Sequence, residues 1–167
     1  KTGSLFPHPY DSKEQVYKDI REINRRLIPK GLCLIPLRFT EKNVLLYLYR
    51  PAWLRRDLSD ETACEVLREM GYTRSDCGSC LAQLMRRMQQ AGSEFPHEVG
   101  LFLSYPPEDV KGFIDNEAAN YKYIGLWKVY GDEQEARQLF EQYRKCTDVY
   151  CSQWAKGRSI ERLTVAV

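Results

Sequence analysis

Two apolar runs joined by a short polar connection restrict the fold more than any other feature of this chain. Residues 32–39 and 44–49 are rich in apolar and aromatic side chains, and the four polar residues 40–43 separate them. A connection of this length is typical of a β-hairpin. Pro36 has no N–H to donate to a central ladder, so its run is predicted to lie at a sheet edge or at a bulge. The sequence therefore predicts an early antiparallel hairpin.

Helix signals lie before and after this hairpin. Ser12, with Gln15 three residues later, forms a capping-box pattern before a stripe of apolar residues that ends at Leu27. Further helices are predicted to start at Ser59, at Asp76, at Pro106 and Pro107, at Asp132 and at Asp148. Helices are therefore predicted along most of the chain.

Short apolar runs predict the remaining strands at residues 99–103, 123–130 and 163–167. In the strand over 123–130, period-two alternation turns Trp127 and Val129 inward and Lys128 away. Strands that alternate with helices favour parallel pairing through right-handed crossovers. With the antiparallel hairpin, this predicts a mixed α/β (α+β) fold. The predicted fold is a single domain over residues 1–167, with a mixed sheet of about five strands covered by helices.

Charge and apolar content exclude several classes of function. The formal net charge is only +2, which predicts neither nucleic acid nor a membrane surface as a partner. The pairs Arg25-Arg26, Arg55-Arg56 and Arg86-Arg87 are scattered and are interpreted as solvated helix faces. No apolar run approaches the roughly 20 residues that span a bilayer. Six cysteines are too few for a disulfide framework at this length, so a reduced, cytoplasmic protein is predicted. The chain starts without methionine, and its natural N-terminus is expected to be truncated.

The first candidate site is His97 with Glu98, because these residues stand at the mouth of a predicted buried strand. Near neutral pH an imidazole can accept or donate a proton, and a neighbouring carboxylate can orient it. Consecutive side chains of a strand, however, point to opposite faces, so the two groups need not meet. In the competing structural interpretation, His97 caps the strand or binds the backbone near Pro106.

Cys77 and Cys80 form a CxxC pattern at a helix start, which is the second candidate. A helix N-terminus lowers a thiol pKa and favours redox chemistry, and the spacing also suits zinc, with Cys146 and Cys151 as remote ligands. The competing interpretation, packing of free thiols at successive helical turns, is favoured.

The third candidate is a group of arginines, Arg50, Arg55 and Arg56, beside Trp53. Arginine next to an aromatic ring can bind an anionic group or a base. Exposed pairs with surface acids are the commoner role and are preferred here.

The run from Phe95 to Ile114, FPHEVGLFLSYPPEDVKGFI, and the later run from Gly125, GLWKVYGDEQEA, together resemble one protein family. They are similar to the bacterial family of small proteins of unknown function called DUF3793. KTGSLF at Lys1 and YRPAWL at Tyr49 also resemble family segments, so the resemblance spans nearly the whole chain. Ser104 stands where the family pattern has glycine. The family implies no activity, cofactor or catalytic residue.

Two classes of function follow. One is a small-molecule-binding or enzymatic domain with its site near His97, and the alternative is a noncatalytic protein-interaction module. A CxxC redox or zinc protein is a lesser alternative. A pocket that contains His97, Glu98 and an arginine would favour the first class. A flat exposed patch of Trp and Tyr would favour the second.

Overall fold

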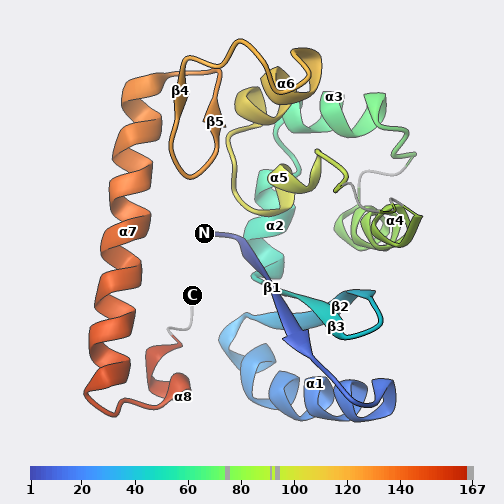
Figure 1. Cartoon of the computed structure of the whole chain (residues 1–167), viewed down its shortest axis with the longest axis vertical. Coiled ribbons are helices and arrows are strands. Elements are labelled where there is room, and N and C mark those ends of the chain that lie inside the picture. Colours follow the sequence, from blue (N-terminus) through green and yellow to red (C-terminus); the bar gives the residue numbers. More distant parts are fainter. Residues whose placement is uncertain (74–75, 91, 93–94, 165–167) are drawn as a thin grey trace.

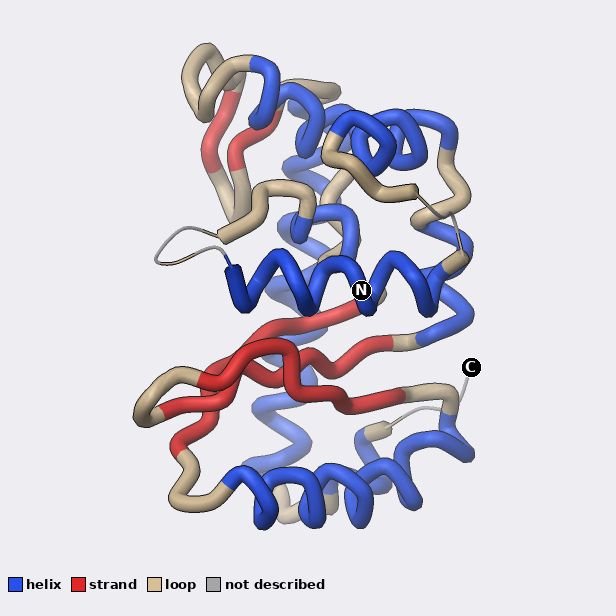
Figure 2. The backbone as a smooth tube through the Cα atoms, turned by 90° about the vertical axis from the view of Figure 1, so that its right-hand side faces the viewer, coloured by secondary structure: helices blue, strands red, loops and turns tan. Residues whose placement is uncertain are grey.

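The computed structural model describes residues 1–73, 76–90, 92 and 95–164. A three-stranded sheet lies in one half of the molecule, with helices on both sides of its strands (Figures 1 and 2). The long helix α7 (Glu133–Ala155) runs along the left border in Figure 1, and a small two-stranded hairpin lies beside its upper end. None of the described helices is long and apolar enough to cross a membrane.

The sheet is antiparallel throughout, with the strand order β1-β3-β2. It consists of β1 (Gly3–Pro9), β2 (Cys33–Phe39) and β3 (Asn43–Tyr49). The predicted early hairpin is confirmed as β2 and β3, and the register shifts between Pro36 and Arg38 of the edge strand β2. Strand β1 was not predicted, because Pro7 and Pro9 obscure its pattern. These prolines are tolerated at the other sheet edge, where fewer N–H groups need partners.

Both faces of the sheet are covered. Helix α1 (Lys13–Leu27) packs Val16 and Ile20 against Leu34, Val44 and Leu46 on one face. Its predicted cap is confirmed, because the Ser12 side chain accepts the Gln15 N–H at 3.4 Å. The other face carries the larger core, which includes Tyr47, Leu54, Leu84 and Phe102. Three short α-helices and one longer helix supply this core: α2 (Pro51–Asp57), α3 (Glu61–Glu69), α4 (Cys77–Gln90) and α5 (Val99–Phe102).

The predicted strand over residues 99–103 is wrong, since Val99–Phe102 forms helix α5. A short buried apolar run fits a strand or a helix equally well, and packing decides between them. The expected strand over 123–130 is also corrected. It is a hairpin of β4 (Tyr123–Ile124) and β5 (Lys128–Val129), paired with each other as a separate sheet. The inward packing of Trp127 and Val129 is confirmed, because they are 8% and 0% exposed.

The predicted parallel pairing is wrong as well. Among the described residues, the strand pairs β1–β3, β2–β3 and β4–β5 are all antiparallel. Helix α6 (Pro107–Asp115) leads into the β4–β5 hairpin instead of returning to the large sheet. The predicted final helix from Asp148 is the second half of the continuous helix α7. Of the predicted strand over 163–167, Leu163 ends helix α8 (Ile160–Leu163), and 165–167 lie outside the described residues.

Other elements follow their local signals closely. The 3-10 helix η1 (Ile28–Lys30) ends α1, and Gly31 terminates it with a left-handed φ of 73°. Pro106 and Pro107 begin α6 as predicted. Asp60 rather than Ser59 caps α3, because its carboxylate accepts the Ala63 N–H at 3.1 Å. The Ser59 hydroxyl donates instead to the Arg56 carbonyl at 2.6 Å.

Candidate functional site

The segment from Phe95 to Glu98 is a tight turn that leads into helix α5. The Val99 N–H donates to the Pro96 carbonyl at 3.0 Å, and the Gly100 N–H donates to the His97 carbonyl at 3.3 Å. This turn directs the two side chains of the first candidate differently. The His97 side chain is exposed, whereas Glu98 is fully buried. The His97 ring packs edge-on against the Phe113 ring, with centroids 5.0 Å apart.

Glu98 is held by two side chains from neighbouring elements. Its Oε1 accepts the Tyr72 hydroxyl at 3.0 Å and the Arg87 Nε–H at 2.5 Å. Arg87 also donates from Nη1 to the Met70 carbonyl at 3.2 Å. Burial, followed by the Glu98 charge, raises the pKa of Tyr72. Within the part of the chain that the structure describes, Glu98 Oε2 is buried and has no hydrogen-bond partner.

A cavity of about 350 Å³ joins His97, Glu98 and Arg87. The other lining residues are Met70, Gln90, Phe95, Pro96 and Ile114. We call this cavity the His97 cavity. Arg87 had been assigned to a solvated helix face, and this interpretation is wrong because its guanidinium reaches inward to Glu98. Its spacing from Cys80 and Leu84 (seven and three residues) places it on the buried face of α4, and this signal could have identified it.

A second cavity, of about 360 Å³, shares Phe95, Pro96 and His97 with the first and extends to the β4–β5 hairpin. Buried Asp109 anchors this hairpin. It accepts the Trp127 indole N–H at 2.7 Å, and the backbone N–H groups of Tyr130 and Gly131 at 2.7 and 2.8 Å. Residues 95–97 and residues 124–128 line this one cavity, although they lie far apart in the sequence.

The arginine candidates divide between different places. Arg50 and Arg56 lie over the Trp53 ring, at 5.3 and 5.7 Å from its centroid. Arg55 lies in the last turn of α2 and does not line the cavity that Trp53 and Arg56 share. This third cavity, of about 420 Å³, also includes Asp57, which accepts Arg56 Nε and Nη2 at 2.9 and 2.7 Å.

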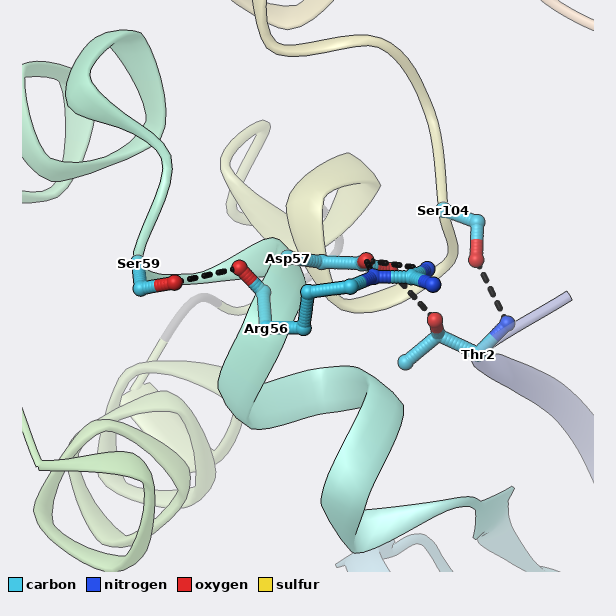
Figure 3. A network of polar contacts seen from close by, with 5 residues as sticks. All are labelled: Thr2, Arg56, Asp57, Ser59 and Ser104. Carbon is cyan, nitrogen blue, oxygen red and sulfur yellow. Dashed lines mark hydrogen bonds and ion pairs between the residues drawn. The ribbon is translucent and has the colours of Figure 1, made fainter. Parts of the chain in front are cut away.

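Figure 3 shows how Asp57 connects this arginine to the first strand. Asp57 Oδ2 accepts the Thr2 hydroxyl, and the Thr2 N–H donates to Ser104 Oγ at 2.5 Å. Ser104 has a φ of 66°, in the left-handed region that glycine adopts readily. Glycine would adopt this conformation with less strain than serine. The polar groups of this network are mostly occupied by one another, which fits a structural role.

The cysteine candidates lie in two unrelated settings. Cys77 begins α4 and Cys80 is buried in the core, where burial raises both thiol pKa values, that of Cys80 to about 11. The opposite shift would be needed for a reactive thiolate. Cys146 and Cys151 lie on the exposed part of α7, and all six cysteines are free. In the described ranges, no group of three or more His, Cys, Asp and Glu side chains is placed to hold a metal ion.

Comparisons with known proteins give one result. A family model with the description "Protein of unknown function (DUF3793)" matches residues 1–164. No curated protein and no solved structure matches the chain.

Proposed function

The chain belongs to DUF3793, a family of proteins of unknown function, and from its geometry we propose that it binds a small molecule in the His97 cavity. One observation carries this proposal. A single cavity of about 350 Å³ collects four polar side chains, Arg87, Gln90, His97 and Glu98, beside an apolar wall of Met70, Phe95, Pro96 and Ile114. Small-molecule sites combine these properties, in that apolar walls supply contact area and a few fixed polar groups supply orientation.

The polar groups of the cavity are held in place before any ligand arrives. Arg87 is fixed by Glu98 and by the Met70 carbonyl, and Glu98 is fixed by Tyr72. The Phe113 ring supports His97. Preorganised groups lose little conformational entropy on binding, which supports a binding role for this site.

The test is a fragment screen by NMR, read from the backbone N–H signals of residues 95–99 other than Pro96. We expect fragments that shift these amides, and we expect His97→Ala to weaken their binding without unfolding the protein. His8→Ala is the matched control, because His8 is the other histidine of the chain, lies in the exposed half of strand β1 and lines another cavity. No shift at 95–99, or equal losses in the two variants, would refute the proposal.

A noncatalytic interaction module is the second candidate, and the exposed half of α7 favours it. Val149, Tyr150 and Trp154 are 52%, 45% and 57% exposed there. Aromatic residues are enriched at protein interfaces. Sedimentation velocity over a range of concentrations, on wild type and Trp154→Ser, tests self-association through this helix. Monomers at every concentration in both proteins would count against that form of the alternative.

Two further proposals concern partners and compartment. The net charge of +2 supports the absence of nucleic acid and membrane surfaces among the partners. Six free cysteines fit a reducing compartment and support a cytoplasmic location. Salt-dependent retention on immobilised DNA would contradict the first proposal, and disulfide formation in the protein isolated from its cells would contradict the second.

A further inference from the structure

The unpaired oxygen of Glu98 limits which ligand the His97 cavity can accept. Glu98 is fully buried, and its Oε1 already accepts from Tyr72 and Arg87. Oε2 has no partner among the described residues. Buried polar atoms in native proteins are nearly always hydrogen-bonded, so an orphaned carboxylate oxygen calls for an external donor. Glu98 also lines the cavity, so a ligand there lies beside this carboxylate.

We infer that the ligand of the His97 cavity carries a hydrogen-bond donor, a primary amine in its best-matched form, that binds Glu98 Oε2. The inference rests on the proposed function and names the chemical class of its ligand. A carboxylate accepts hydrogen bonds and donates none, so an N–H or O–H group satisfies Oε2 and a ligand acceptor does not. A protonated amine makes the stronger, charge-assisted bond.

An anionic ligand fits the same cavity poorly, although Arg87 lines it. Two of the Arg87 nitrogens, Nε and Nη1, already donate to Glu98 and to the Met70 carbonyl. An incoming anion would also lie close to the Glu98 charge, in surroundings where repulsion is weakly screened. The apolar lining residues, which include Phe95, Pro96 and Ile114, suit a compact hydrocarbon body beside the donor.

The test compares three probes of one size on the wild-type protein: benzylamine, benzyl alcohol and benzoate. Titrations are followed by the backbone amide shifts of residues 95–99. We expect benzylamine to bind more tightly than benzyl alcohol, and benzoate not to bind in the same concentration range. Benzoate binding as tightly as benzylamine would overturn the inference.

Glu98→Gln supplies a matched variant. The Arg87 donor keeps the amide oxygen at the Oε1 position, so the amide NH₂ replaces Oε2 and presents donors instead of an acceptor. Benzylamine should then bind about tenfold to a hundredfold more weakly, as for loss of one hydrogen bond to a charged group. Unchanged benzylamine affinity in a folded variant would also overturn the inference, and the wild-type series decides the question if the variant does not fold.

Failure of the inference and failure of the proposed function give different results. If other fragments shift the amides of residues 95–99 and benzylamine does not, the ligand class is wrong and the binding site stands. If no fragment of any chemistry shifts them, both proposals fall.

Discussion

Replacing Asp109 should destabilise the protein more than replacing any exposed acid, because one buried carboxylate holds three donors. Asp109 is 3% exposed, and it accepts from the Trp127 indole and from the backbone of Tyr130 and Gly131. Hydrogen bonds to charged groups contribute about 1.5–3 kcal/mol each, but bonds in one network do not add. We therefore expect Asp109→Ala to cost about 3–5 kcal/mol, because it leaves three buried donors unsatisfied at about 1–3 kcal/mol each, and these costs add less than fully.

Asp109→Asn tests the separate roles of the two carboxylate oxygens, because it replaces one of them with an NH₂ group. Oδ1 serves the two backbone donors and Oδ2 serves the indole, so the amide NH₂ must face the Trp127 N–H or displace both backbone bonds. Either arrangement leaves a buried donor unsatisfied, at a cost of about 1–3 kcal/mol.

The assay is urea denaturation followed by far-UV circular dichroism, with free energies extrapolated to water. Asp115→Asn is the control, because exposed Asp115 only pairs with Lys111 at 3.5 Å on the surface of the same helix. The control should cost less than about 0.5 kcal/mol. The reasoning is refuted if Asp109→Asn and its control agree within about 0.5 kcal/mol, or if Asp109→Ala costs under about 1 kcal/mol.

Two other predictions concern backbone conformation and pH. The Ser104→Gly variant should be more stable than Ser104→Ala by about 1 kcal/mol in denaturant titrations. Both variants lose the hydroxyl, but only glycine adopts the φ of 66° without backbone strain. A more stable alanine variant would contradict this. Stability should fall at alkaline pH, because burial raises the pKa of Tyr72 above its ordinary 10.0 and that of Cys80 from 9.0 to about 11. Because the two pKa values are raised in the folded state, both groups contribute their full stabilisation below about pH 9, the ordinary pKa of the thiol. This stabilisation is lost as the pH rises through the pKa values of the folded state. Urea titrations at about pH 8 and pH 10.5 should show a smaller loss for Tyr72→Phe than for wild type, and equal losses would contradict the assignment.

Short-range signals predicted the elements whose stability is decided locally. The Ser12 cap, the Gly31 helix end and the Pro106-Pro107 helix start depend on backbone groups a few residues away. The β2–β3 hairpin depends on a turn of the same range. These predictions were confirmed because the interactions that stabilise them are contained in the same short segments.

The candidate site was predicted only in part. His97 and Glu98 were identified from the residue types and from their place before an apolar run. Their opposite directions follow from the turn into α5, where a strand had been predicted. Arg87 was missed, because its pair with Glu98 joins α4 to a separate turn of the chain. Sequence spacing contains no information on which buried acid such an arginine meets.

The sequence by itself determined the helix caps, the early hairpin, the inward register of Trp127 and Val129, and the family to which the chain belongs. Tertiary structure alone decided that β1 pairs with β3 across some forty residues, at Gly3 with Tyr49 for example. It also decided that residues 99–102 are helical, and that Asp109 binds the later hairpin. The physical reason is the distance along the chain between the groups that interact. Caps and turns are satisfied by neighbours, whereas strand pairing and the burial of a carboxylate depend on partners that only the folded chain brings together.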